Sequence, residues 1–484
     1  MADSGEGTQT ADARPAPATG TPVLAHCHAH SRLISAHGIL NAGAKMTGLA
    51  FVTLFLGNAC VGAQRPPAVP TSVTRSVHEI DAIAAPPVSA TTAIVGATVI
   101  DGRCGPVLRD AVVLVRGSRI VAVGSRAATV IPVGAKIIDG SGRTLVPGLI
   151  DAHFHLDGDD ALPALFLSHG VTSVRDPGAW IEAYAQVRRS TDAVPRLFLA
   201  GPHLDGVSPA YPNDALVVRD ADETRRAVDM LVSQGASVIK AYFRLPPSLL
   251  RVVVSTAHAR GVPVTTHLEV VDADEAIRAG VDGVEHITSF GTALLPPRDA
   301  ERYRQSVMAD NNARRDGRYS VWNAIELNSP RVAPVLQLIV SRGTFISPTL
   351  AVFEKQANDS GATPAQVHAF AQMLAFTGMI RRAGGHVVVG SHSSVPHAER
   401  GWAYQRELEL LVASGLTPMQ AIVAGTSENA AFFRVSDRLG TIAVGKLADL
   451  VLVLGDPLQD ITRMRHVDRV MLNGRWVDSK PNTR

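Results

Sequence analysis

The sequence predicts an α/β protein: a (β/α)8 TIM barrel with a small β-sandwich domain built from both ends of the mature chain. Residues 148–436 alternate short apolar runs with helix-like segments, which is the pattern of parallel βαβ units. The flanking segments, 92–147 and 437–484, are instead rich in Val and Ile with glycine turns, as in small antiparallel strands. A chain of 484 residues also suits one large domain with a smaller one.

The N-terminal region is expected to lie outside both domains. Residues 1–45 are rich in Ala, Gly, Thr and Pro without apolar periodicity, so we interpret them as a disordered or mis-annotated leader, with Met46 as a candidate start. Residues 46–63 have the shape of a signal peptide, and 64–91 that of a linker. We therefore expect export to the periplasm or the extracellular space. A lipid anchor at Cys60 is a weaker alternative, because the residues before it match a lipobox poorly.

Charge and composition limit the partners. The chain has 46 Lys+Arg against 44 Asp+Glu, a balance that does not favour nucleic acid or an anionic membrane. We expect a small-molecule substrate and no stable membrane span after signal cleavage, and we leave a homo-oligomer open.

Eight apolar segments of the middle region are candidate barrel strands. They are 149–156, 171–176, 196–201, 237–243, 262–268, 283–287, 344–350 and 386–392. Active sites of such barrels lie at the carboxyl ends of the strands. A doubly wound open sheet is the alternative, but no glycine-rich phosphate loop follows the first segment.

Polar residues recur at the ends of these segments. His153 and His155 alternate in the first segment, so both side chains point to the same side. Several neutral imidazoles facing one pocket are typical of a metal site. A lysine would repel a metal as an ammonium, and it joins a ligand set only after carbamylation by CO₂. The further candidates in this pattern are Lys240, His267, His286 and His392.

Several motifs in order resemble the amidohydrolase superfamily. They include "VPGLIDAHFHL", "GVTSVRDPG", "SVIKAYF", "THLE", "GVEHI", "ISPTL" and "GLTPMQAIVAGTSENAAFF". The similarity is greatest to its imidazolonepropionase-like and Xaa-Pro dipeptidase-like metal-dependent members, and it runs from about Thr92 to Val477.

The resemblance implies two divalent metal ions, with zinc favoured, and a metal-activated hydroxide that attacks an amide-type carbonyl. His153 and His155 would hold the buried ion, N6-carboxylated Lys240 would bridge, and His267 and His286 would hold the second ion. Tyr242 matches a residue that contacts the substrate's carboxylate in dipeptidase members. His203, near the rim, is a further candidate for substrate contact.

One position departs from the family. Where the eighth strand should end in Gly-Thr-Asp, the chain has Gly390-Ser391-His392. The missing aspartate would ligate the first metal and move the proton to the leaving amine. His392 is therefore a candidate replacement as ligand and as catalytic acid–base group. The alternatives are a site that binds metal without turnover, and a substitution that is a sequence error or a recent lesion.

The leading functional prediction is an exported metal-dependent amidohydrolase that cleaves a C–N bond in a dipeptide, N-acyl amino acid or cyclic amide. The alternative is a catalytically impaired metal-binding barrel. A deaminase is a weaker third hypothesis, because deaminases of this superfamily commonly use one metal and no bridging lysine. Specificity is expected to reside in a loop over the pocket within 290–330, in which we find no recognisable motif.

Overall fold

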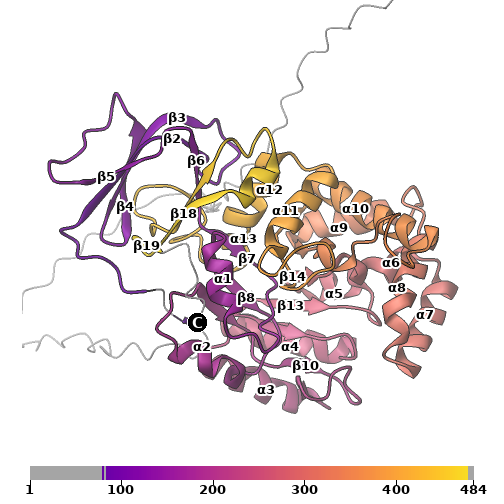
Figure 1. The fold of residues 1–484 in the computed structure, drawn as a ribbon. Coiled ribbons are helices and arrows are strands. Elements are labelled where there is room, and N and C mark those ends of the chain that lie inside the picture. Colours follow the sequence, from indigo (N-terminus) through magenta and orange to yellow (C-terminus); the bar gives the residue numbers. More distant parts are fainter. Residues whose placement is uncertain (1–78, 81–82, 478–484) are drawn as a thin grey trace, which may run out of the picture.

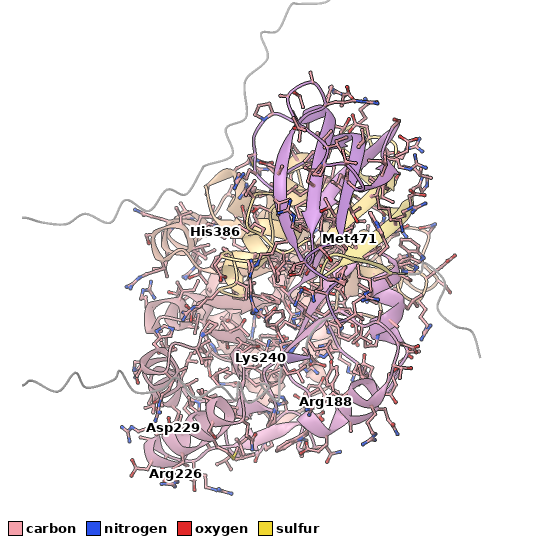
Figure 2. All side chains as sticks on the ribbon, turned by 90° about the vertical axis from the view of Figure 1, so that its left-hand side faces the viewer. Arg188, Arg226, Asp229, Lys240, His386 and Met471 are labelled. Atoms are coloured by element: carbon pink, nitrogen blue, oxygen red, sulfur yellow. The ribbon has the colours of Figure 1, made fainter. Side chains whose placement is uncertain are left out.

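The computed structural model describes residues 79–80 and 83–477, and its strands form three sheets. The predicted leader and signal peptide lie outside the described residues. Figure 1 shows a β-rich part formed by both ends of the described chain, beside a larger part in which helices surround short strands. In Figure 2 Met471 lies in the β-rich part, whereas Lys240 lies inside the larger part.

The β-rich part is one eight-stranded, mainly antiparallel sheet. Its order is β19-β18-β17-β6-β2-β3-β4, and β5 pairs with β2. The two ends of the chain meet where β17 runs antiparallel to β6, with Leu450 opposite Pro147. The predicted β-structure from both ends is therefore observed, as one continuous sheet. The strands are β2 (Thr91–Val99), β3 (Leu108–Arg116), β4 (Arg119–Ser125), β5 (Lys136–Asp139), β6 (Arg143–Pro147), β17 (Leu450–Leu454), β18 (Val467–Leu472) and β19 (Arg475–Val477).

The middle of the chain forms two sheets that are parallel apart from one edge strand. One has the order β1-β9-β8-β7, with β1 antiparallel, and the other has the order β11-β10-β12-β13-β14-β15-β16. All eight predicted strands are present in their predicted order, although most are shorter than expected. The strands are β1 (Glu79–Ile80), β7 (Leu149–Asp151), β8 (Val171–Asp176), β9 (Arg196–Leu199), β10 (His203–Asp205), β11 (Ala215–Val217), β12 (Ile239–Ala241), β13 (Val264–His267), β14 (Gly283–Glu285), β15 (Phe345–Ser347) and β16 (His386–Val387).

Backbone hydrogen bonds connect the two parallel sheets at both ends. Ala152 N, after β7, donates to Val389 O, after β16, at 2.9 Å. Ser237 N, before β12, donates to Leu199 O of β9 at 2.9 Å. Asn429 strengthens the first junction, because its buried side-chain amide donates to both Ile150 O and Val389 O. The carboxyl ends of strands from both sheets therefore face a common region.

Helices follow most of the strands and bury an apolar face against them. α3 is representative: the Asp220 carboxylate caps its N-terminus by accepting from the backbone N–H groups of Asp222 and Glu223, and Val228 and Leu231 are fully buried. The helices are α1 (Leu162–Ser168), η1 (Ile181–Tyr184), α2 (Ala185–Arg189), α3 (Ala221–Ser233), α4 (Pro247–Ala259), α5 (Ala273–Ala279), η2 (Ile287–Phe290), α6 (Gly291–Leu294), α7 (Pro297–Ala309), α8 (Ala313–Ala324), α9 (Val332–Arg342), η3 (Leu350–Phe353), α10 (Pro364–Arg382), α11 (Ala403–Ala413), α12 (Pro418–Val423), the π-helical η4 (Ala424–Glu428), α13 (Asn429–Phe432) and η5 (Ile461–Arg465).

Within residues 79–80 and 83–477, no helix combines the length and the apolar character needed to cross a membrane.

Candidate active site

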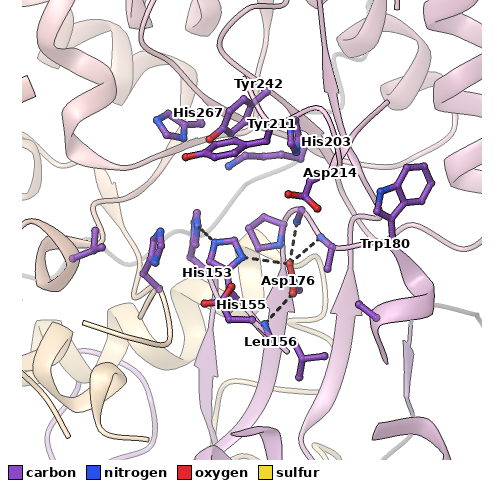
Figure 3. Close-up of a pocket in the computed structure, with 18 of the residues that line it drawn as sticks. His153, His155, Leu156, Asp176, Trp180, His203, Tyr211, Asp214, Tyr242 and His267 are labelled. Carbon is purple, nitrogen blue, oxygen red and sulfur yellow. Dashed lines mark hydrogen bonds and ion pairs between the residues drawn. The ribbon is translucent and has the colours of Figure 1, made fainter. Parts of the chain in front are cut away.

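A pocket of about 630 Å³ opens at the carboxyl ends of the parallel strands, a size that suits a small ligand (Figure 3). All the predicted site residues line it, although they are spread over much of the chain. These are His153, His155, His203, Lys240, Tyr242, His267, His286 and His392.

The strand ends deliver these side chains. Lys240 is the central residue of β12 and His267 is the last residue of β13. His286 and His392 follow β14 and β16 with positive φ angles of 65° and 60°, which are uncommon for residues other than glycine. Such backbone conformations are often found at functional sites, where the surrounding structure stabilises them.

His153 is fully oriented by its neighbours. Its Nδ1 lies 2.8 Å from Glu285 Oε2, so the other ring nitrogen, Nε2, is directed away from that carboxylate. Nε2 lies 3.1 Å from Nε2 of His155. Two imidazole nitrogens bound to one tetrahedral zinc at about 2.0–2.1 Å would be roughly 3.3 Å apart, so this short N···N separation suits two ligands of the same ion.

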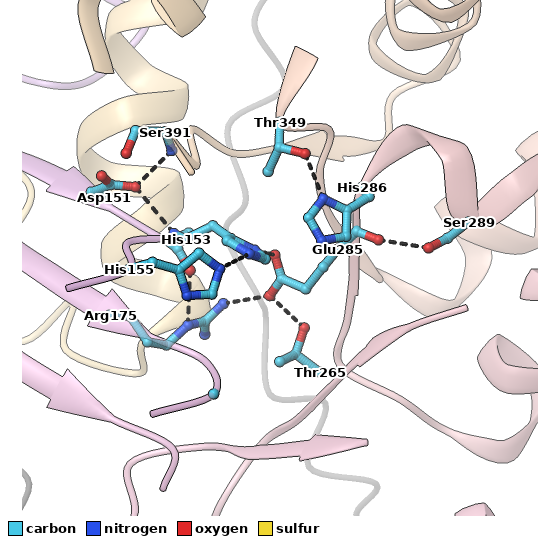
Figure 4. Close-up of polar contacts among 12 residues, drawn as sticks. Asp151, His153, His155, Arg175, Thr265, Glu285, His286, Ser289, Thr349 and Ser391 are labelled. Atoms are coloured by element: carbon cyan, nitrogen blue, oxygen red, sulfur yellow. Dashed lines mark hydrogen bonds and ion pairs between the residues drawn. The ribbon is translucent and has the colours of Figure 1, made fainter. Parts of the chain in front are cut away.

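Glu285 is the central acceptor beneath the histidines (Figure 4). It is completely buried, and its other oxygen, Oε1, accepts from Arg175 Nη2 at 3.0 Å and Thr265 Oγ1 at 2.7 Å. Arg175 also donates to Ala152 O, which ties it to the backbone beside His153. Acceptors of this kind fix the tautomer and orientation of a metal-binding histidine. Sequence reasoning did not identify Glu285 or Arg175 as parts of the site.

His155 has a second acidic neighbour. Its Nδ1 lies 3.7 Å from Asp176 Oδ1, an ion-pair contact shown in Figure 3. Burial lowers the pKa of His155, but the nearby Asp176 carboxylate outweighs this effect and raises the pKa overall. Asp176 is itself held by Tyr184, whose hydroxyl donates at 2.6 Å.

His267 and His286 are oriented in the same way as His153. His267 Nε2 lies 3.2 Å from Glu269 Oε1, and His286 Nδ1 lies 2.7 Å from Thr349 Oγ1. Burial lowers the pKa of His267 to about 4 and the pKa of His286 well below its ordinary value. Both imidazoles are therefore neutral at physiological pH, the form that binds metals, and each keeps one ring nitrogen free of these partners.

Lys240 lies between these groups and is only 3% exposed. Its Nζ has no hydrogen-bond partner among the described residues. Burial lowers its pKa to about 8, with Glu285 opposing the shift and Arg175 adding to it. A buried amine without a hydrogen-bond partner is energetically unfavourable. The position of Nζ therefore suits a bound ligand or a covalent modification that would satisfy it.

His392 occupies the position of the aspartate expected from the family. Ligand atoms of His153, His286 and His392 all lie within 4.8 Å of one another. Burial, followed by the charge of His155, lowers the pKa of His392 well below its ordinary value. Gly390 lets the backbone before His392 pass close to His153 and Ser347, because a Cβ there would lie 2.3 Å from Ser347 Oγ and 2.7 Å from His153 Cβ.

Aromatic rings form the wall beside the histidines. Tyr242 packs against His203, with ring centroids 4.3 Å apart, and against Tyr211 at 5.9 Å. His203 Nε2 is buried and has no hydrogen-bond partner in the part of the chain that the structure describes, and burial lowers the pKa of His203 to about 3. Burial and nearby carboxylates raise the pKa of Tyr242, so its hydroxyl remains protonated.

The segment 290–330 differs from the loop expected there, since most of it forms the helices α6, α7 and α8. Arg314 and Arg318 of α8 line the pocket. Arg318 donates to Glu269 at 3.0 Å and thereby joins the group that orients His267. The sequence contains several arginines here without a motif, so neither pocket residue was predicted.

Comparison with known proteins identifies the family. The sequence profile described as the Amidohydrolase family matches residues 144–477, more than half of the chain. The chain belongs to the amidohydrolase family. The resemblance inferred from the motifs is therefore confirmed.

Curated relatives of this amidohydrolase are similar over parts of their length. N-acyl-D-aspartate deacylase from Alcaligenes xylosoxydans xylosoxydans is 32% identical over 218 residues, covering 44% of this chain and 40% of the relative. Adenine deaminase 3 from Rhizobium meliloti is 25% identical over 390 residues, covering 78% of this chain and 56% of the relative. The chain thus spans about half the length of the curated relatives it matches.

Solved structures share the fold of this amidohydrolase. A Xaa-Pro dipeptidase with bound methionine in the active site has a TM-score of 0.64 and 22% identity, covering 80% of this chain and all of that chain. The ochratoxinase of A. niger has a TM-score of 0.62 and 20% identity, covering 80% of this chain and 95% of that chain.

Proposed function

We propose that the protein is an exported, metal-dependent hydrolase that cleaves a C–N bond in a dipeptide, N-acyl amino acid or cyclic amide. The observation that carries this proposal is the convergence of Lys240 and several histidines in one pocket. Three of these histidines, His153, His267 and His286, have one ring nitrogen held by an acceptor. Membership of the amidohydrolase family supports a hydrolase acting on C–N bonds. We also propose the domain architecture: the two parallel sheets close into a barrel over 148–436, and residues 92–147 and 437–484 form a β-sandwich.

The donor set fits two divalent ions, with zinc favoured because imidazole is its usual nitrogen ligand. His153, His155 and His392 would hold one ion, and His267 and His286 would hold the other. When bound, such ions lower the pKa of water and polarise a carbonyl group.

Lys240 is suited to carboxylation as the bridging ligand. Carbamate formation needs the uncharged amine, and burial makes this form more available by lowering the pKa of Lys240 to about 8. The product would be an anion where Nζ now lacks a partner, and the two metal ions held by the histidines would balance its charge.

The remaining pocket residues would bind and orient the substrate. Neutral His203 has a free Nε2 beside the histidine cluster, so it can donate a hydrogen bond to a carbonyl oxygen on which negative charge develops. The Tyr242 hydroxyl can donate to a second polar group of the substrate. Glu285 and Arg175 act through His153, whose ring they hold in place.

His392 favours a second candidate function, a barrel that binds metal and ligand without efficient turnover. The nearness of its ring to His153 and His286 suits a ligand, and a nitrogen bound to metal is not available as a base. Loss of a general base typically lowers the rate about 10²–10⁴-fold. In H392D, a large rate gain would identify the native site as impaired, whereas a loss would assign a working role to His392.

The proposed function is tested by a hydrolysis screen of the zinc- and bicarbonate-loaded protein against dipeptides, N-acyl amino acids, cyclic amides and adenine. We expect amide hydrolysis that falls at least about 100-fold in H153N and is unchanged in H368N, where the replaced histidine is exposed. Retained zinc with no turnover of any compound would favour the binding function. Turnover of adenine alone would identify a deaminase. The proposed export would be checked by fractionation of cells that express the full chain.

A further inference from the structure

Arg314 is a buried cation with no acidic partner within residues 79–80 and 83–477. It lies in the first turn of α8, lines the pocket and is only 5% exposed. Among the described residues its Nε has no hydrogen-bond partner, and none of their ion pairs includes it. Arg318, one turn further along α8, differs because Glu269 neutralises its charge at 3.0 Å.

The surroundings of Arg314 are aromatic and cationic. Its guanidinium carbon lies 5.1 Å from the ring centroid of Tyr211 and 5.6 Å from that of Phe243. Burial, followed by the charges of Arg318 and Arg315, lowers the pKa of Arg314 to about 9. The side chain is therefore charged at neutral pH. The ring contacts stabilise it only in part, since a buried charge normally requires an ion of opposite sign.

We propose that Arg314 binds a free carboxylate of the substrate and thereby restricts the enzyme to substrates that carry one. This inference rests on the proposed hydrolase function of the same pocket. A carboxylate would fill the missing place opposite the guanidinium, whose planar donors match its two oxygens. Burial of an arginine in a ligand pocket without an internal acid is the arrangement expected when the ligand supplies the anion.

Tyr242 lies where it can complete this carboxylate site. Its ring is 5.9 Å from that of Tyr211, so Arg314 and Tyr242 both flank Tyr211. Tyr242 lines the same pocket as Arg314, and its hydroxyl can donate a hydrogen bond to the same anion. One uncompensated cation and one neutral donor suit a single negative charge, whereas a dianionic phosphate would call for further cations. We therefore assign the site to a carboxylate.

The test compares R314Q with R315Q, a matched control. Arg315 is the next residue of α8 and is exposed, so both variants remove one positive charge from the same turn. Binding to the zinc-loaded protein is measured by calorimetry for N-acetyl amino acids and dipeptides, each as the free carboxylate and as the C-terminal amide, with phosphate and phenyl phosphate as further probes. Hydrolysis of the same compounds is recorded separately.

We expect the wild type and R315Q to bind at least one carboxylate about 10- to 100-fold more tightly than its amide, because a charge-assisted hydrogen bond is lost in the amide. In R314Q this preference should shrink to less than about threefold. The melting temperature of R314Q should stay equal to that of R315Q or rise, because the variant removes an uncompensated buried charge; a purely structural arginine would lower it.

An unchanged carboxylate preference in R314Q, or no preferred carboxylate in the wild type, would overturn the proposal. Tighter binding of the phosphates than of every carboxylate would also overturn it. Carboxylate binding that depends on Arg314 but is accompanied by no hydrolysis would leave this inference standing and refute the proposed catalytic function instead.

Discussion

Replacing Glu285 by glutamine should separate the buried charge beneath the histidines from the shape of the site. The substitution keeps the size of the side chain and one oxygen, which can still accept from Arg175 and Thr265. It replaces the other oxygen, to which His153 Nδ1 is held at 2.8 Å, by a donor group. The charge that balances Arg175, itself only 1% exposed, is lost as well.

Two effects of known size follow from E285Q. Removing one partner of a buried ion pair typically destabilises a protein by about 3–5 kcal/mol. We expect a loss of about 3 kcal/mol for E285Q, because the glutamine oxygen can still accept from Arg175. Loss of the acceptor that orients a metal-binding histidine typically weakens metal affinity about 10- to 100-fold. The first effect is measured by urea unfolding in a chelator, and the second by zinc competition with a chromophoric chelator.

T265V is the matched control for E285Q. It removes a single hydrogen bond, from a neutral hydroxyl to the same carboxylate oxygen, and leaves the ion pair with Arg175 intact. We expect a loss of about 1.5 kcal/mol, the lower end for a hydrogen bond to a charged group, because Arg175 still pairs with that oxygen. The zinc affinity should stay within about twofold of the wild type. The reasoning would be refuted if E285Q resembled T265V in both measurements, because the Glu285 charge would then support neither Arg175 nor His153.

Three further predictions concern other parts of the structure. N429A removes the amide that donates to Ile150 O and Val389 O, and it should lower the free energy of unfolding by about 2–4 kcal/mol in urea, more than the exposed N323A. D220A removes the N-cap of α3 and should lower it by about 1 kcal/mol; no change would show that water replaces the cap. His203 has a pKa lowered to about 3, so its contribution is fully present above the unfolded value near 6.5 and is lost as the pH falls toward 3. In H203Q the loss of stability between pH 6.5 and 4.5 should therefore be smaller than in the wild type by about 2–3 kcal/mol in urea titrations, and equal losses would contradict this.

Local sequence features were sufficient to predict the strand order and the pocket histidines. An apolar run predicts a buried strand, and a polar residue at its end, such as His267, predicts the carboxyl end of that strand. Most strands of the parallel sheets could therefore be placed from the sequence. The short strands β10 and β11 were missed, because three-residue strands give little periodic signal.

The groups that support the histidines could not be found in this way, because their partners lie far away along the chain. Arg175 and Glu285 are 110 residues apart, and each belongs to a segment that predicts only a buried strand. Arg314 is one of three arginines in α8, and only the packing of that helix against its neighbours, including Phe243 and Tyr211, determines which of them line the pocket. A helical period alone does not distinguish a pocket-facing arginine from an exposed one.

The central claim is that the pocket holds two metal ions on its histidines and on carboxylated Lys240. The most direct test is elemental analysis of zinc per chain after loading with zinc and bicarbonate and dialysis without chelator, for the wild type and for K240M. We predict close to two zinc ions in the wild type and at most one in K240M. A wild-type chain that retains no zinc would contradict the metal centre itself, and equal zinc in both proteins would contradict the bridging role of Lys240.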